Sequence, residues 1–347
     1  MELLLIRAMI RLNYVPDQLG KTLLFPASKS GSDIHVMDTL LPKQPIRPVL
    51  GLECIAKRIE CVITFYFNDA GFELDLLDGT SGESTALSAA AASCLVAEDA
   101  FYSGKLFIAL DCDKDNAFVR VPFWQVALGY QYLGVPLQLI DFMENLQIRT
   151  YSMNTAYGPT PFVPSVQGTC QGSVLGVLHY AVANYPIQLH YMQTGDQYVT
   201  GGTGLVTGVT TSLTIYVDDE RHYFASPAAL LERLHLMERF NACTGAKLNP
   251  SKTSICYALA NDPDIQHMEA PTLPDARCQR RPVSILSPSD PVKRLGTHSS
   301  LNGRCLGTAR SVLSKITSFT AAVGKRLIPF SQMKYLINSC RGGMRLC

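Results

Sequence analysis

The chain has 347 residues, of which 47% are hydrophobic and 17% charged, a composition typical of folded proteins that excludes wholesale disorder. No apolar run approaches the roughly 18–20 residues that a membrane span needs, so no membrane partner is expected. Scattered cysteines without a secretion signal indicate an intracellular location, nuclear or cytoplasmic.

The net charge of +1 hides an uneven distribution of charge along the chain. Residues 277–347 hold 13 Lys and Arg against the single acid Asp290, whereas the upstream part holds 17 basic and 28 acidic residues. A basic C-terminal part is suited to binding phosphates, although it could also be a poorly folded tail.

The first third of the chain predicts alternating helices and strands. Residues 1–12 form an amphipathic pattern, residues 15–50 predict short strands and loops, and residues 51–67 have helical periodicity. An Ala-rich helix is expected from Glu83 to about Tyr102, ending at Gly104. Residues 106–113 (LFIALDCD) are apolar and end in carboxylates, which predicts a buried strand.

The middle of the chain continues this mixture. The only tryptophan, Trp124, is expected in the core, and residues 174–187 predict a helix that Pro186 stops. The Gly/Thr-rich residues 195–214 indicate a hairpin or loop leading into a strand at 213–219 (LTIYVDD). Ser226 and Pro227 then predict the start of a helix that Gly245 ends. Interleaved helices and strands with long connections favour an α+β fold over a doubly wound sheet.

Adjacent carboxylates follow the strand at 213–219. Asp218 and Asp219 repel each other unless a cation lies between them, and a hairpin tip is a natural place to present them to a metal ion. Taken alone, two adjacent aspartates more often form a solvated turn.

A second acidic strand end strengthens the metal hypothesis. Asp111 and Asp113 share one face of their strand, because side chains alternate with a period of two. This strand end and the pair at 218–219 lie 105 residues apart and could converge to hold two divalent ions. Two ions ~3.5–4 Å apart can stabilise the attacking and leaving oxygens of a phosphoryl transfer. Mg²⁺ suits such a site, because it accepts few protein carboxylates and retains water and phosphate ligands.

Several blocks, in order, resemble segments of the reverse transcriptases of non-LTR (LINE-type) retrotransposons between about residues 20 and 300. Residues 97–124 resemble the first catalytic segment, usually an aspartate, three residues and Ala-Phe-Asp-Arg-Val. Alignment on Ala117-Phe118 and Arg120-Val121 implies that Asp113 is a metal ligand and that Phe118 packs under the sugar, disfavouring ribonucleotides. Asp111 remains a rival for Asp113.

The other blocks imply further substrate contacts. The Gly-x-x-Gln-Gly block would place Gly168, Gln171 and Gly172 on the template and incoming nucleotide. Residues 215–219 match the Tyr-x-Asp-Asp block and imply that Asp218 and Asp219 are catalytic metal ligands. Residues 244–255 match the next block, with Lys252 near the triphosphate. A segment around Arg47 would contact incoming phosphates.

The resemblance implies a right-hand polymerase fold with an antiparallel-sheet palm. Residues 1–105 would form an N-terminal extension and fingers, residues 106–300 the palm with inserted elements, and residues 301–347 the start of a helical thumb. The implied activity is RNA-directed DNA synthesis from dNTPs on an RNA template and DNA primer. It would use two Mg²⁺ ions, or Mn²⁺, with an endonuclease domain elsewhere in the element.

Departures from the usual segments leave an alternative open. Val119 stands where the family has a second aspartate, Asn116 where it has lysine, and Ser-Val-Leu-Gly-Val replaces a proline-containing stretch after Gly172. The chain could therefore be a fragment or diverged copy of such an element. Alternatively, it could be an inactive nucleic-acid-binding scaffold or a decayed remnant.

Overall fold

The computed structural model describes residues 2–28, 46–51, 54–69, 86–155, 158–165, 167–169, 173–195, 197–201, 208–258, 268–275, 277–290, 292–294, 297–299, 313–314 and 317. The chain forms two compact units, each assembled from separate segments. The first contains residues 1–81, 116–189 and 240–246, and the second contains residues 82–115, 190–239 and 247–347. This division does not test the predicted boundaries at residues 105 and 300, which stay predictions.

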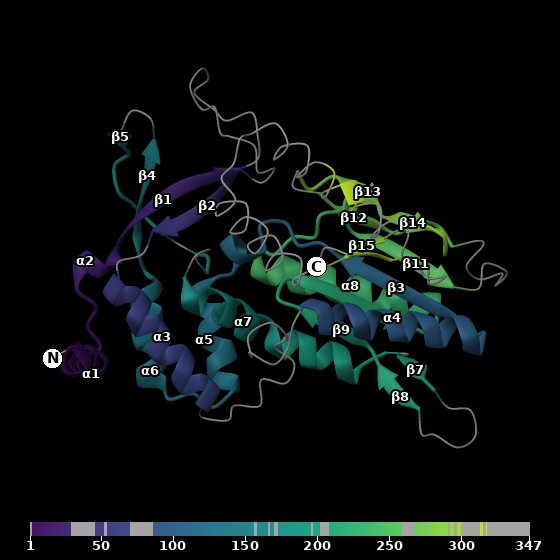
Figure 1. Ribbon diagram of the computed structural model, residues 1–347, viewed down its shortest axis with the longest axis horizontal. Coiled ribbons are helices and arrows are strands. Elements are labelled where there is room, and N and C mark those ends of the chain that lie inside the picture. The colour runs from purple at the N-terminus through teal and green to yellow at the C-terminus, as the bar shows by residue number, and fades with distance from the viewer. Residues whose placement is uncertain are drawn as a thin grey trace. The chain divides into compact units, whose positions relative to one another are not determined.

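Groups of helices and groups of strands are interleaved along the chain (Figure 1). The helices are α1 (Glu2–Leu12), α2 (Asp17–Gly20), α3 (Cys54–Asp69), α4 (Ala86–Ser103), η1 (Ala117–Arg120, a 3₁₀ turn), α5 (Phe123–Tyr132), α6 (Leu137–Gln147), α7 (Val174–Gln193) and α8 (Pro227–Thr244). The strands up to the aspartate pair are β1 (Lys21–Ser28), β2 (Ile46–Gly51), β3 (Phe107–Cys112), β4 (Thr150–Thr155), β5 (Gly158–Pro159), β6 (Val163–Pro164), β7 (Tyr198–Thr200), β8 (Val209–Thr211) and β9 (Leu213–Tyr216). The later strands are β10 (Asp219–Phe224), β11 (Ser254–Ala258), β12 (Thr272–Pro274), β13 (Arg280–Pro282), β14 (Ser284–Leu286), β15 (Val292–Arg294) and β16 (Thr297–Ser299).

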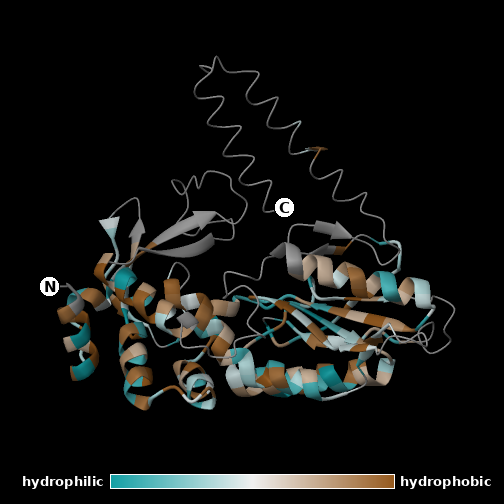
Figure 2. Cartoon of the chain, turned by 60° about the horizontal axis from the view of Figure 1, so that its bottom comes forward, coloured by the Kyte–Doolittle hydropathy of each residue, from teal (hydrophilic) through white to brown (hydrophobic). Residues whose placement is uncertain are grey.

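The second unit is built on a five-stranded sheet in the order β14-β11-β3-β10-β9. All its strand pairs are antiparallel except β11 with β14, so the predicted α+β class with an antiparallel sheet is confirmed. Helix α4 covers one face, where Ser93 hydrogen-bonds Tyr223 of β10 at 3.0 Å. Helix α8 covers the other, where Arg233 donates to His222 at 2.9 Å. Figure 2 shows helices above and below this sheet.

The first unit contains a second five-stranded sheet. Its order is β2-β1-β4-β5, with β6 also paired to β4. Strands β1 and β4 are parallel, and the other pairs are antiparallel. Helices α1, α2 and α5 contact α6 in the same unit. No helix among the residues that the structure describes is both long and apolar enough to cross a membrane.

The prediction that Pro186 stops a helix is wrong, because α7 continues through it to Gln193. A proline within a helix removes the donor for the carbonyl four residues earlier, here that of Val182. That carbonyl lies against Gly129 of α5, where a Cβ would be only 2.2 Å from the oxygen. The next carbonyl, that of Ala183, accepts a hydrogen bond from the buried Gln125 side chain at 3.0 Å. Helix α5 therefore compensates for the disruption.

Most other sequence-based elements are confirmed, with one exception in side-chain placement. Helix α8 begins at Pro227, with the Ala229 amide 3.3 Å from the Ser226 hydroxyl, and Gly245 follows its last residue with a φ of +78°. Trp124, expected in the core, is 53% exposed. The buried face of α5 carries Gln125, Val126, Gly129 and Tyr130, which leaves Trp124 on the opposite face.

Candidate active site

Asp113 directly follows the central strand of the second unit's sheet. Strand β3 has β10 on one side and β11 on the other, and four of its residues, Phe107–Leu110, have no exposed surface. An apolar run of this length suits a strand that is covered on both faces. The strand ends at Cys112, so the half-exposed Asp113 comes at the point where the chain leaves the core.

Asp218 and Asp219 lie at the tip of the hairpin between β9 and β10. Tyr216 pairs with Asp219, which leaves Val217 and Asp218 as the two turn residues. Val217 has a φ of +59°, in the left-handed region that a β-branched residue rarely adopts. A strained residue of this kind persists where the surrounding structure fixes it, often at a functional site. The predicted strand at 213–219 is therefore a hairpin that presents the two aspartates.

The sheet brings these two acidic strand ends side by side. Strands β3 and β10 are antiparallel, with Cys112 opposite Glu220. Asp113 and Asp219 are the next residues beyond this pair, and alternation assigns them to the same face. The predicted convergence of the two strand ends is thus confirmed at the level of the backbone.

An ion pair ties the two strand ends together. The Lys114 ammonium lies 2.6 Å from the Glu220 carboxylate, and both side chains are largely buried. Each member of this pair directly follows a candidate metal ligand, Asp113 or Asp219. The ion pair therefore fixes the separation of the two acidic turns.

The structure separates the roles of Asp111 and Asp113. Asp111 accepts two hydrogen bonds of 2.7 Å from the guanidinium of Arg221, which is 3% exposed. Burial opposes the positive charge, but the Asp111 carboxylate more than compensates and raises the pKa of Arg221 above its ordinary value. Asp111 is therefore committed to a buried ion pair, whereas the Asp113 side chain is 34% exposed and lies 3.4 Å from the ammonium of Lys252, a side chain that is itself 65% exposed.

A buried polar network lies beneath Asp219 on the α8 face. Arg233 donates to Nδ1 of His222 at 2.9 Å, so the proton of the neutral imidazole is on Nε2, which lies 3.5 Å from Glu220. Burial lowers the pKa of His222 to about 4, against the opposing effect of Glu220. Burial also acts to raise the pKa of Glu220, but Lys114 and His222 together hold it well below its usual range. The network thus keeps a carboxylate ionised inside the sheet.

Sequence reasoning missed this network. Residues 220–222 are a Glu-Arg-His run directly after the aspartates, a pattern that usually indicates a solvated strand end. Every residue from Glu220 to Phe224 is instead buried, because helices cover both faces of β10. A buried charge is rarely tolerated without a partner, and here each charged residue has one.

Lys252 and Asp113 come from separate sequence blocks and meet in the structure. The turn at 249–252 is held against the end of β3, since the Asn249 amide donates to the Asp113 carbonyl at 2.8 Å. The Asn249 side chain accepts hydrogen bonds from Ser251, and the Asn249 carbonyl accepts one from the Lys252 amide. The exposed Lys252 side chain can therefore reach the same solvent region as Asp113.

The donor set has the chemistry that a magnesium ion requires. Carboxylate oxygens are its usual protein ligands, and it commonly takes only one or two of them beside water and phosphate oxygens. Within the part of the chain that the structure describes, no three His, Cys, Asp or Glu side chains are grouped closely enough to hold a metal ion. The assignment of Asp113, Asp218 and Asp219 as ligands stays a prediction.

Two further residues that the sequence predicts to bind substrate lie together in the first unit. Phe118 is in η1, its ring packs on Tyr180 with centroids 4.8 Å apart, and its carbonyl accepts from the Thr169 amide at 2.8 Å. Gly168 has a φ of +104°, and a Cβ there would lie 3.0 Å from the Val119 carbonyl oxygen. The block around Gly168 is thus packed directly against the Phe118 segment.

The remaining predicted contacts are only partly described. Arg47 lies in β2, where its backbone pairs with Ala27, and its side chain is outside the described part. Gln171 and Gly172 also lie outside the described residues.

A buried carboxylate beside this block was not predicted from the sequence. Glu60 of α3 is 1% exposed and accepts hydrogen bonds from the Ser173 hydroxyl at 2.9 Å and the Val174 amide at 2.7 Å. Its other oxygen lies 2.6 Å from Arg149. Glu60 therefore caps the first turn of α7, immediately after Gln171 and Gly172. Its position on the apolar face of the predicted helix at 51–67 was the available signal.

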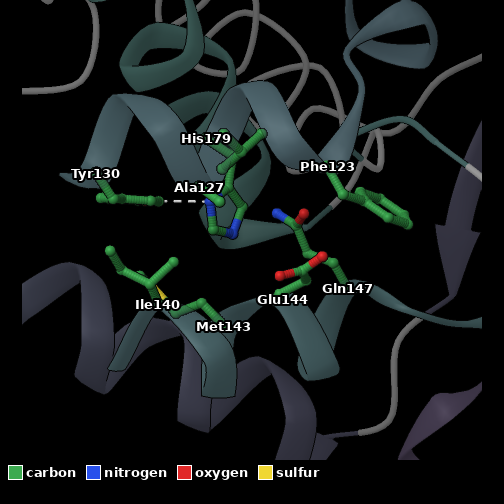
Figure 3. A pocket seen from close by; sticks show the side chains of 9 residues that line it. Phe123, Ala127, Tyr130, Ile140, Met143, Glu144, Gln147 and His179 are labelled. Carbon is green, nitrogen blue, oxygen red and sulfur yellow. Dashed lines mark hydrogen bonds between the residues drawn. The ribbon is translucent and has the colours of Figure 1, made fainter. Parts of the chain in front are cut away.

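A small cavity of about 10 Å³ lies in the first unit between α5, α6 and α7. His179 accepts or donates a 3.1 Å hydrogen bond with the Tyr130 hydroxyl, and Figure 3 shows Glu144 and Gln147 extending toward its ring. Burial, with a smaller effect of Arg149, lowers the pKa of His179 to about 3. His179 is therefore a neutral packing residue.

No protein-family model and no curated protein sequence matches the chain. Solved structures of telomerase are partly similar to this chain, at low sequence identity. Telomerase from Candida tropicalis truncated from its C-terminal domain aligns with 83% of this chain and 55% of its own, at 12% identity and a TM-score of 0.45. Telomerase from Candida albicans in complex with a TWJ fragment of telomeric RNA aligns with 85% of this chain and 48% of its own, at 12% identity and a TM-score of 0.43. The chain thus spans about half the length of the structures it matches.

Proposed function

We propose that this protein is an RNA-directed DNA polymerase that adds dNTPs to a primer 3′-hydroxyl. The observation that carries the proposal is the pairing of β3 with β10, which sets Asp113 beside the turn that bears Asp218 and Asp219. Adjacent carboxylates at two strand ends suit the binding of divalent cations, which is the usual requirement of phosphoryl transfer.

The proposed reaction is attack of the primer 3′-oxygen on the α-phosphorus of a dNTP, with pyrophosphate as the leaving group. Mg²⁺ ions bound by Asp113, Asp218 and Asp219 would lower the pKa of the attacking hydroxyl and neutralise developing charge. Lys252, 65% exposed and able to leave Asp113, is proposed to contact the triphosphate. Its ammonium would stabilise the charge that accumulates on the leaving group.

The residues of the first unit are proposed to select and orient the substrates. Phe118 would pack under the sugar and disfavour a 2′-hydroxyl, while Arg47 would bind incoming phosphates. Gly168, Gln171 and Gly172 would contact the template and nucleotide. The capping of α7 by Glu60 supports this role, because it fixes the helix that follows the Gln171-Gly172 pair.

We also propose that the chain derives from a non-LTR retrotransposon, as a fragment or a diverged copy. The ordered sequence blocks support this origin. The alternative is a catalytically inactive scaffold that binds nucleic acid, and the loss of an acidic residue at Val119 favours it.

Primer extension tests the proposal directly. The purified chain would be given poly(rA)/oligo(dT), dTTP and Mg²⁺, beside the double variant Asp218→Asn/Asp219→Asn. Glu238→Gln, a change in a surface ion pair on α8, provides a matched control that leaves the acidic turns intact. Extension by the wild type and the control but not by the double variant is the expected result. A folded wild type that binds the primer–template and does not extend it would instead support the scaffold.

A further inference from the structure

A groove of about 290 Å³ lies in the second unit beside the end of β3. One wall is formed by Asp115, Leu248, Asn249 and Pro250, and the other by Asp275, Arg277 and Arg281. Neither arginine lies in one of the sequence blocks that carry the resemblance to reverse transcriptases. The first wall begins two residues after Asp113, so the groove opens next to the proposed catalytic segment.

The first wall is fixed by backbone hydrogen bonds. The Asp115 amide donates to the Lys247 carbonyl at 2.8 Å, and the Asn249 amide donates to the Asp113 carbonyl at the same distance. A β-bridge between Lys114 and Leu248 lies between them. These contacts attach the first wall to the residues that directly follow the strand ending in Cys112.

The second wall is a turn held by Asp275. Its carboxylate accepts hydrogen bonds from the amides of Arg277 and Gln279, at 2.8 and 2.9 Å, and lies 3.3 Å from Arg281. The amide of Gln279 contributes most to holding the pKa of Asp275 below its ordinary value. Cys278 has a φ of +60°, so this turn, like that at Val217, holds a non-glycine residue in the left-handed region.

These contacts leave Arg277 as the available cation of the groove. Arg281 faces Asp275, and Arg280 lies 2.8 Å from Glu238. Among the residues that the structure describes, the Arg277 side chain has no ion-pair or hydrogen-bond partner. The carboxylate nearest to it in sequence, Asp275, is already used by the turn. A solvent-facing guanidinium beside a polar groove is suited to binding phosphate bidentately.

We infer that this groove binds a backbone phosphate of the nucleic-acid strand held at the Asp113 segment, with Arg277 as the contact residue. The inference rests on the proposed function and adds a binding site outside its catalytic residues. It also accounts for the first of the 13 basic residues that make the C-terminal part of the chain positive. The same guanidinium chemistry would accept the phosphates of a free nucleotide, so the test must separate the two sources.

Fluorescence anisotropy with a labelled primer–template, in EDTA and without dNTPs, measures binding independently of catalysis. Wild type, Arg277→Ala, Arg277→Lys and the control Arg7→Ala, an exposed arginine of α1, would be titrated at several salt concentrations. Arg277→Ala should weaken binding about tenfold and reduce the slope of log affinity against log salt by about one. Arg277→Lys should keep the slope and recover part of the affinity, because a point charge replaces the guanidinium fork.

The outcomes separate this inference from the proposed function. If the wild type extends primers but Arg277→Ala and Arg7→Ala bind the primer–template equally well, the groove assignment is wrong and the proposed function stands. A second arm measures competition by unlabelled dTTP. If Arg277→Ala changes only the concentration of dTTP that displaces the primer–template, the groove binds free nucleotide and the strand assignment is wrong. If the wild type binds the primer–template but cannot extend it, weaker binding by Arg277→Ala than by Arg7→Ala would support the groove even though the polymerase proposal fails.

Discussion

Asp111 and Asp113 are two residues apart, yet their surroundings give them different tasks. Asp111 neutralises a buried arginine, whereas Asp113 lies at the solvent-facing end of the strand. Removing one member of a buried ion pair leaves the other charge uncompensated, which costs about 3–5 kcal/mol. Removing the charge of a solvent-facing carboxylate costs little stability.

The two conservative variants should therefore fail in different assays. Asp111→Asn should lower the free energy of unfolding by about 3 kcal/mol. Asp113→Asn should leave that free energy within about 0.5 kcal/mol of the wild type while abolishing primer extension. Urea denaturation and the extension assay measure the two effects. A stable, inactive Asp111→Asn protein beside an active Asp113→Asn protein would reverse the assignment of the metal ligand.

His179 makes the free energy of unfolding depend on pH. Its pKa is about 3 in the folded chain and about 6.5 in the unfolded chain, so the unfolded state binds the extra proton first. The stability contributed by the neutral ring is fully present above pH 6.5 and is lost as the pH falls toward 3. The loss should reach about 1.4 kcal/mol per pH unit within this window.

Comparison with His179→Gln isolates this effect from the titration of carboxylates. Glutamine can still accept a hydrogen bond from Tyr130, but it has no proton to gain in this range. The difference in unfolding free energy between the two proteins should therefore change steadily between pH 6.5 and pH 4. A difference independent of pH would show that the His179 ring is not held neutral by burial.

At the scale of elements, α7 depends on a cap supplied from outside its own sequence. Backbone amides at a helix start lack helical partners, and Glu60 of α3 satisfies that of Val174 while also pairing with Arg149. Glu60→Ala should therefore lower the free energy of unfolding by about 3–5 kcal/mol, because Arg149 is 2% exposed and would lose its partner.

Ser173→Ala is the matched variant, since it removes one hydrogen bond to Glu60 and leaves both charges in place. It should cost about 1 kcal/mol. Thermal or urea unfolding of both proteins measures the contrast. Equal losses in the two variants would mean that the ion pair with Arg149 contributes nothing beyond the cap.

Elements with strong local signals were predictable, and those decided by distant contacts were not. The apolar run that forms β3, the Ser226-Pro227 start of α8 and the glycine after its end all follow from short-range chemistry. The prediction that Pro186 ends a helix was wrong because the contacts that compensate for the proline come from α5, more than fifty residues earlier in the chain. The prediction that Trp124 lies in the core was wrong because it was based on the residue type and not on the position of the residue on the helix.

At the scale of the whole chain, both compact units are assembled from interleaved segments. The first unit includes residues 240–246, which are far from its other parts in sequence, and the second includes residues 82–115. Assembling a unit from such segments depends on contacts between distant residues, which composition and periodicity do not reveal. The convergence of Asp113 with residues 218–219 could be predicted only because each block has its own recognisable sequence pattern. The Glu220–His222–Arg233 network has no such pattern.

The ion pairs on the two faces of β10 also determine how this strand can pair with β3. Arg221 faces Asp111 on one side of the sheet, while Glu220 faces Lys114 and His222 faces Arg233 on the other. A slip of one residue would exchange the faces of β10. It would turn Glu220 toward Asp111 and Arg221 toward Arg233, burying like charges together. Misaligned pairing of β10 with β3 during folding is thus penalised electrostatically.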